Sequence, residues 1–257
     1  MAAVAALLDR GAALTALRRT LPRGSAGGAA TPAVACRSAA ELSRLPARRM
    51  LDAVVTSPHR LGSAELADIG TRFPALPIIL YAAFRPDDGA LLSASRADGV
   101  AAIAVEGVDD PVVGDIVSRH SLTARRRAAM ADGPRVLRLE DPFQRKVWDL
   151  LVAQVERPVR TAELARVLKV SREHLSRQFA AGGAPTLKRV IDLTRIAAAA
   201  QLSANPGYSA GDVARLLGFT SASHLAATTR RIVGLGARSL DKLGPRGVLA
   251  AFARNRR

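Results

Sequence analysis

The chain has little of what secreted and membrane proteins depend on. Its 257 residues include one cysteine, Cys36, so a single chain can form neither a disulfide framework nor a cysteine metal site. No apolar run approaches the roughly 20 residues that a membrane-spanning helix needs. These absences predict a cytoplasmic protein with no membrane partner, no bound metal and no other cofactor.

Two motifs that would indicate an enzyme are also missing. The sequence contains no phosphate-binding P-loop and no His-Glu-x-x-His zinc motif. Ser57 and His59 are close in sequence, but adjacency in a chain does not make a catalytic triad. We therefore expect a protein that is not an enzyme.

Charge is distributed unevenly along the chain. Residues 1–120 carry 13 basic and 12 acidic side chains, whereas residues 121–257 carry 25 basic and 10 acidic ones. A near-neutral half joined to a strongly basic half indicates two modules, the second facing a polyanion. A composition rich in arginine would also give a merely soluble basic surface, so charge alone does not identify the partner.

The first 120 residues alternate short apolar runs with amphipathic stretches. The expected strands are Ala3–Leu8, Ala33–Cys36, Ala53–Thr56, Ile78–Tyr81 and Ala101–Val105. The expected helices lie near residues 11–20, 38–46, 63–72, 88–97 and 110–119. Nearly continuous apolar strands are typical of a parallel sheet covered on both faces. The alternation therefore predicts an α/β, doubly wound, flavodoxin-like domain.

Residues 1–120 resemble the receiver domain of response regulators. The resemblance is carried by residues 51–56 as the third strand, 73–80 leading into the fourth and 97–102 leading into the fifth. In such a domain, a carboxylate after the third strand accepts a phosphoryl group and an acidic pair after the first strand holds Mg²⁺. A hydroxyl side chain follows the fourth strand, and a lysine follows the fifth.

The phosphorylation site of this receiver-like domain is degenerate. Ser57 stands at the acceptor position, Asp9 is the one acid left of the pair, and Asp52 lies too early in its strand to serve. Ala82 replaces the hydroxyl and Glu106 lies near the lysine position. The resemblance implies that ordinary aspartyl phosphorylation does not control this domain. It could instead form a dimer, hold a partner or bind a small ligand at the strand ends.

The basic half begins with a predicted linker over residues 121–140. The triplet Arg125–Arg127 is followed by the breaker Asp132-Gly133-Pro134. The triplet could contact phosphates or form a solvated helix face. We expect a helical domain over residues 141–243 to follow, and then a basic C-terminal tail over residues 244–257.

Two stretches of the basic half repeat each other. Glu163–Leu168 recurs 49 residues later as Asp212–Leu217, and Ser171 with His174-Leu175 recurs 50 residues later as Ser221 with His224-Leu225. Each copy predicts a helix-turn-helix, whose second helix enters the DNA major groove. Between them, residues 186–204 predict a helix of about 19 residues, roughly 28 Å long, which is close to the ~34 Å of one DNA turn.

The second helix of the first copy is expected to begin at the cap Ser171 and to bury Leu175 and Phe179. Its exposed face would carry Arg172, Glu173, Ser176 and Arg177. Arginine can bind guanine and glutamate can accept from cytosine, so this face is suited to base recognition. For His174, a packed or phosphate-contacting role is favoured over metal binding, because no second ligand lies at helical spacing.

Residues 141–243 resemble the DNA-binding domain of AraC-type transcription factors. The resemblance is carried by residues 171–179 (SREHLSRQF) and 212–225 (DVARLLGFTSASHL). It implies that the base-facing positions are Glu173, Ser176 and Arg177 in the first unit and Ala222, Ser223 and Ala227 in the second. Ala227 stands where arginine is usual and Thr229 where a core phenylalanine is usual. The second unit should therefore contact fewer bases, pack more loosely and hold phosphates through Arg230 and Arg231.

Taken together, the sequence predicts a sequence-specific, double-stranded DNA-binding transcription regulator. The residues expected to contact DNA are Arg172, Glu173, Ser176, Arg177, Ser221, Ser223, Arg230 and Arg231. A homodimer is expected, with RNA polymerase as a further candidate partner. The alternative is a protein-interaction or nonspecific DNA-binding module whose second DNA-reading unit has decayed.

Overall fold

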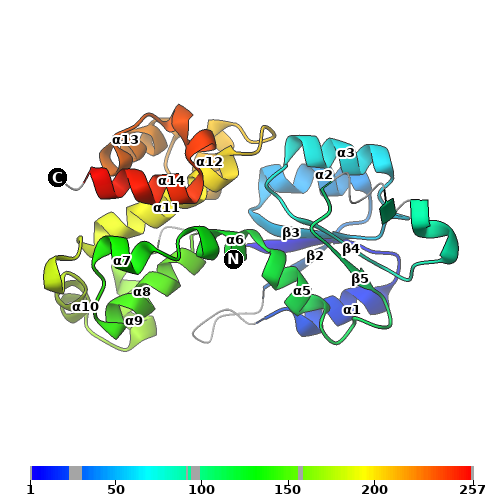
Figure 1. Cartoon of the computed structure of the whole chain (residues 1–257), viewed down its shortest axis with the longest axis horizontal. Helices are drawn as coiled ribbons and strands as arrows, with labels where there is room; N and C mark the ends of the chain where they lie inside the picture. Colours follow the sequence, from blue (N-terminus) through cyan, green and yellow to red (C-terminus); the bar gives the residue numbers. More distant parts are fainter. Residues whose placement is uncertain (1, 23–30, 91, 94–98, 156–158, 256–257) are drawn as a thin grey trace. The chain divides into compact units, whose positions relative to one another are not determined.

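A computed structural model describes residues 2–22, 31–90, 92–93, 99–155 and 159–255 of the chain (Figure 1). The residues form two compact units. The α/β unit comprises Met1–Arg125 with Asn205–Gly207, and the helical unit comprises Arg126–Ala204 with Tyr208–Arg257.

The α/β unit is built on a five-stranded parallel sheet. Its strands are β1 (Ala3–Leu7), β2 (Ala33–Ala35), β3 (Leu51–Thr56), β4 (Ile78–Ala82) and β5 (Ala102–Val105). They are ordered β2-β1-β3-β4-β5, and every pairing is parallel. This is the strand order of flavodoxin-like folds, so the predicted fold class is confirmed. All five residues of β1 and of β4 are buried, as a sheet covered on both faces requires.

Helices cover both faces of this sheet (Figure 1). They are α1 (Gly11–Thr20), α2 (Ala39–Arg48), α3 (Ser63–Arg72), the 3₁₀ turn η1 (Pro86–Asp88) and α5 (Val113–His120). Helices α1 and α5 pack together because Gly114 has no side chain: a Cβ there would lie 2.2 Å from the carbonyl carbon of Thr20. The helix expected near 88–97 falls partly on residues 91 and 94–98, which lie outside the described residues.

The segment expected as a linker contains two helices, α6 (Leu122–Ala129) and α7 (Gly133–Leu137). Arg126, the middle residue of the arginine triplet, is fully buried. Its guanidinium donates to the carbonyl of Val152 at 2.9 Å and to Oε1 of Gln201 at 3.0 Å. Arg126 therefore belongs to the interior of the helical unit, and the expectation of a solvated or phosphate-contacting triplet is wrong for this residue.

The helical unit is organised around one long buried helix, α11 (Leu187–Ser203). Every residue of α11 from Val190 to Leu202 is buried. The other helices are α8 (Pro142–Ala153), α9 (Thr161–Leu168), α10 (Arg172–Phe179), α12 (Ala210–Leu216), α13 (Ala222–Val233) and α14 (Leu240–Arg254), with 3₁₀ turns η2 (Ala181–Gly183) and η3 (Ala237–Ser239). None of the described helices is long and apolar enough to cross a membrane.

The predicted basic tail is also wrong, because residues 244–254 belong to α14. This helix packs along α11 and buries Val248 and Phe252. The guanidinium of Arg189 on α11 lies 5.2 Å from the centre of the Phe252 ring. The chain bends at Gly244, whose φ is +58°, and continues as helix from Pro245.

Candidate DNA-binding surface

The first helix-turn-helix consists of α9, a tight turn and α10. Lys169 makes the turn in the left-handed region with φ +55°. Ser171 then begins α10, because its Oγ accepts from the backbone N–H of His174 at 3.1 Å and satisfies one free donor of the first turn. Leu175 and Phe179 are fully buried. The cap and the buried pair fix which face of α10 is presented to solvent.

That exposed face carries the four side chains expected from the sequence. Arg172, Glu173, Ser176 and Arg177 are all exposed on α10. Residues four apart lie on the same face of a helix. Arg172 is therefore next to Ser176 on this face, and Glu173 is next to Arg177. The first recognition helix thus offers two guanidinium groups, a carboxylate and a hydroxyl to a ligand of matching chemistry.

The second helix-turn-helix repeats the construction with α12 and α13. Gly218 makes its turn with φ +66°, and Ser221 caps α13 by accepting from the backbone N–H of His224 at 3.0 Å. Leu225 is buried as Leu175 is. Ser223 and Arg230 are exposed along α13, and so is Arg231.

A histidine beside an aromatic ring recurs at the start of both recognition helices. The rings of His174 and Phe143 lie edge to face with centroids 6.4 Å apart, and those of His224 and Phe219 lie 5.5 Å apart. These contacts favour a packing role for both histidines. Among the described residues, no group of three or more His, Cys, Asp or Glu side chains is placed to hold a metal ion.

Thr229, at the position where the sequence led us to expect loose packing, is fully buried. Its hydroxyl donates to the carbonyl of Leu225 at 2.8 Å, so the polar atom is satisfied inside the unit. Ile232 and Val233 are buried on the same side of α13. That hydrogen bond lies within α13, so it satisfies the buried hydroxyl, and the apolar packing of Ile232 and Val233 anchors the helix.

An ion pair ties α13 to the central helix. A guanidinium nitrogen of Arg231 lies 2.9 Å from a carboxylate oxygen of Asp192, whose side chain is only 10% exposed. The Arg231 side chain remains 54% exposed. The carboxylate of Asp192 therefore competes with any phosphate for this guanidinium.

Arg195 extends the same network to the turn before α13. Its guanidinium lies 3.9 Å from the centre of the Phe219 ring, donates to the carbonyl of Leu217 at 2.9 Å and approaches Asp192 at 3.9 Å. Burial lowers the pKa of Arg195, and the carboxylate of Asp192 opposes that shift. Sequence reasoning missed this network, although a charged pair three residues apart within an otherwise apolar helix was visible as a signal.

A comparison with protein families supports the helix-turn-helix assignment of this region. A family model described as a helix-turn-helix domain matches residues 164–242, which include both recognition helices. Residues 164–242 are an AraC-type helix-turn-helix domain. The AraC-type domain is that of DNA-binding transcription regulators.

The chain was also compared with solved structures and with curated proteins. Full-length FixJ from B. japonicum is a similar solved structure, with 17% sequence identity and a TM-score of 0.36, covering 91% of this chain and 98% of that chain. No curated protein matches the chain.

A hydrolase-like pattern in the AraC-type domain has a structural explanation. Residues 207–211 read Gly-Tyr-Ser-Ala-Gly, which fits the Gly-x-Ser-x-Gly nucleophile motif. Ser209 follows a helix rather than a strand, and it caps α12: its hydroxyl donates to Asp212 at 2.6 Å and accepts from the Asp212 N–H at 3.1 Å. The hydrogen bond from this hydroxyl is the main cause that lowers the pKa of Asp212, and the hydrogen bond from Arg215 is the next. Ser209 therefore acts in helix capping.

In the α/β unit, the receiver-like positions lie at the ends of the strands. Ser57 is fully buried after β3 and its hydroxyl donates to the carboxylate of Asp9. Asp52 lies near the opposite end of β3, where it accepts from the N–H of Thr123 at 2.8 Å and from its hydroxyl at 2.9 Å. The structure thus places a hydroxyl, rather than a carboxylate, directly after β3.

Proposed function

We propose that the protein is a sequence-specific, double-stranded DNA-binding transcription regulator. The observation that carries this proposal is the pair of recognition helices, α10 and α13, each begun by a serine cap in the same domain. The 17 residues of α11 span about 25 Å at 1.5 Å per residue. A rigid helix of this length suits two recognition helices that enter successive segments of the major groove.

The two units have different roles in this proposal. Arg172 and Arg177 supply most of the base recognition, because a guanidinium can form two hydrogen bonds to a guanine. Glu173 and Ser176 add contacts from the same face. Ser221, Ser223 and Arg230 bind mainly phosphates, which position the protein without specifying sequence. Arg231 can do so only in competition with the carboxylate of Asp192.

Selection from a random pool of double-stranded DNA, repeated at two salt concentrations, tests the proposal. We expect an enriched motif whose main block is read by α10; a second block about one helical turn away would show that α13 also reads bases. Arg177→Ala should relax the preference in one block and cost about 1–3 kcal/mol of binding free energy. Arg246→Ala, which removes an exposed arginine from α14, is the matched control and should leave the motif unchanged.

We further propose that ordinary aspartyl phosphorylation does not control this regulator. The buried Ser57 at the end of β3 supports this, because a serine hydroxyl cannot form an acyl phosphate. Incubation with acetyl phosphate and Mg²⁺ should leave both the intact mass and the DNA affinity unchanged. A mass increase of one phosphoryl group on an aspartate would contradict the proposal.

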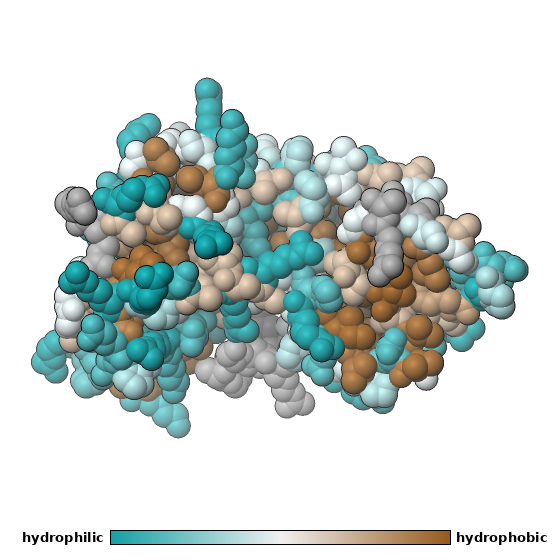
Figure 2. Space-filling model, in the orientation of Figure 1, coloured by the Kyte–Doolittle hydropathy of each residue, from teal (hydrophilic) through white to brown (hydrophobic). Residues whose placement is uncertain are grey.

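A homodimer formed through the α/β unit is also proposed. β5 is an edge strand, and Ile103, Val105, Val108 and Val112 on or after it are exposed. Figure 2 shows hydrophobic side chains gathered over β5 and the loop that follows it. Such a patch is typical of an interaction site. Sedimentation analysis should find a dimer that Val108→Asp converts to a monomer. RNA polymerase remains a candidate partner, since transcription regulators act on it.

Two observations favour the alternative of a decayed second unit. Ala227 provides no polar group on the exposed face of α13, and Arg231 is already paired with Asp192. If the first unit alone is too weak to select bases, the DNA pool would show salt-sensitive binding without enrichment, because only phosphate attraction would remain.

A further inference from the structure

A polar cavity of about 480 Å³ lies at the edge of the α/β sheet where the strands end. Its wall includes Asp9 and Arg10 after β1, His59 after β3, Phe84 and Arg85 after β4, and Glu106 after β5. In a doubly wound sheet, ligands bind at this edge, next to the point where the strand order reverses. Here that point lies between β1 and β3. The volume also falls in the range of small-molecule sites.

Buried groups hold the wall of this cavity in place. The fully buried Ser57 donates its hydroxyl to Oδ2 of Asp9 and accepts from the N–H of His59 at 3.2 Å. Nε2 of His59 lies 3.5 Å from Asp88, and Asp88 accepts from the N–H of Arg85 at 2.7 Å. Asp9, His59 and the backbone of Arg85 are therefore linked to one another at the ends of three strands.

Charges of both signs line the cavity. Arg10 and Glu106 form a pair at 3.8 Å, and the Glu106 side chain is only 10% exposed. Among the described residues, Oδ1 of Asp9 accepts no hydrogen bond and Arg85 forms no ion pair. One carboxylate oxygen and one guanidinium thus remain to meet a ligand.

This arrangement selects against ligands that carry a single sign of charge. An anion on Arg85 would also face the carboxylates of Asp9 and Glu106, and a cation on Asp9 would also face the guanidinium groups of Arg10 and Arg85. A molecule with both an ammonium and a carboxylate offers each of these two groups a partner of opposite charge. The ring of Phe84 adds an apolar surface for the rest of such a molecule.

We propose that this cavity binds a small zwitterion of the amino-acid type. Its ammonium group pairs with Asp9, its carboxylate pairs with Arg85, and its side chain lies against Phe84. The α/β unit is then a sensor of a small molecule at the edge of the sheet where Ser57, rather than a carboxylate, follows β3. The proposal stands apart from DNA recognition, because it concerns a binding site that lies entirely in the α/β unit.

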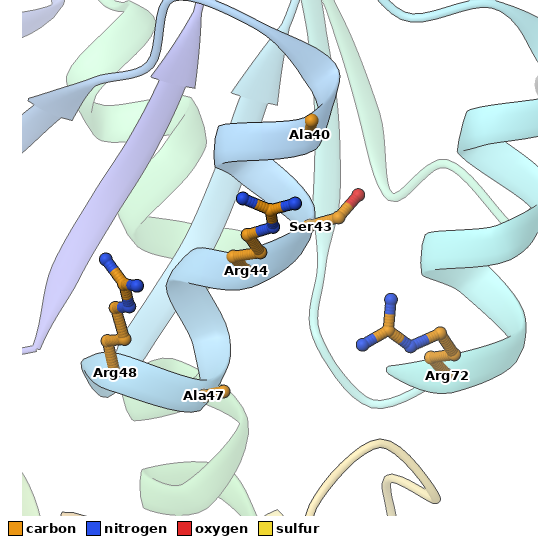
Figure 3. A pocket seen from close by; sticks show the side chains of 6 residues that line it. All are labelled: Ala40, Ser43, Arg44, Ala47, Arg48 and Arg72. Carbon is orange, nitrogen blue, oxygen red and sulfur yellow. The ribbon is translucent and has the colours of Figure 1, made fainter.

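A second cavity in the same unit provides a contrast. It has a volume of about 390 Å³ and lies between α2 and α3. Figure 3 shows Arg44 and Arg48 on α2 and Arg72 on α3 around it, and no acidic residue lines it. Its chemistry suits anions of any kind. Arg44 is therefore a matched position at which to remove a guanidinium without changing the proposed zwitterion site.

Thermal unfolding of the 257-residue chain, followed by calorimetric titration, tests the proposal. Each of the twenty protein amino acids is the probe, with inorganic phosphate alongside. For an amino acid that binds, the acid lacking its amino group and the amine lacking its carboxyl group are added. We expect at least one amino acid to raise Tm by roughly 5 °C at about 100 times its Kd, and both half-molecules to fail.

Variants of the wall distinguish this cavity from other sites. Arg85→Gln removes an exposed guanidinium and should weaken binding at least about tenfold, whereas Arg44→Gln should have no effect. Asp9→Asn should also weaken binding, but it disturbs the bond from Ser57, so Arg85→Gln carries the test. The proposal is overturned if no amino acid raises Tm, if phosphate or a half-molecule acts equally well, or if Arg85→Gln binds normally.

Discussion

Removing the charge of Asp192 should affect both the stability of the helical unit and its mode of DNA binding. Asp192→Asn keeps the size of the side chain, but the carboxylate that serves Arg231 at 2.9 Å and Arg195 at 3.9 Å is lost. Arg195 is 8% exposed, so its guanidinium would be left in the interior without an ionic partner. Breaking a buried pair in this way typically costs 3–5 kcal/mol. We expect about 3 kcal/mol, because Arg231 is half in water.

The same substitution should change the salt dependence of DNA binding. Arg231, released from Asp192, becomes available to phosphates, and each added phosphate contact steepens the slope of log K against log salt by about 0.9. Specific affinity should fall, because α13 loses its tie to α11. Nonspecific affinity should rise at low salt with the added phosphate contact, so the ratio of specific to nonspecific affinity should fall by more than the specific affinity does.

Urea denaturation and fluorescence anisotropy at several salt concentrations measure these effects. Asp241→Asn, an exposed position on α14, makes the same change in net charge and should alter neither stability nor salt slope. If Asp192→Asn is as stable as the wild type and has an unchanged salt slope, the network does not hold α13 as argued.

Three further predictions concern the interior of the two units. Burial raises the pKa of the Cys36 thiol to about 11, so its rate of alkylation should keep rising tenfold per pH unit up to about pH 10, whereas the urea-unfolded chain should level off near pH 8.5. Gly114→Ala should cost at least about 1–3 kcal/mol by urea denaturation, because its Cβ would collide with the backbone of Thr20; Gly11→Ala, with open space around it, should be harmless. Arg126→Ala should cost at least about 3 kcal/mol through its cavity and its orphaned acceptors, and a smaller loss in thermal or urea melts would contradict its structural role.

Sequence reasoning located the strands within one or two residues because they are apolar runs bounded by turns. It failed where a residue departs from the usual behaviour of its type. Arginine is almost never fully buried, so nothing in the sequence separated Arg126 from its two neighbours. The domain boundary was expected after residue 243, yet Gly244 only bends the chain and Pro245 begins a new helical segment. Both features depend on partners that are distant in sequence, namely α8 and α11.

The two helix-turn-helix units separate what the fold requires from what DNA recognition requires. The serine caps, the adjacent histidines and the buried leucines are the same in both units, because each recognition helix must begin and pack in the same way. The charged positions differ: fifty residues after Arg172, Glu173 and Arg177 stand Ala222, Ser223 and Ala227. The second unit therefore has the same capping and packing residues as the first, but it lacks the charged side chains of the recognition face. This supports a second unit that orients the protein on the DNA phosphates while the first selects the bases. Transferring Arg177 to the second unit as Ala227→Arg should then lengthen the selected motif by a second guanine contact, whereas a second unit that does not lie in the groove would gain nothing from the added guanidinium.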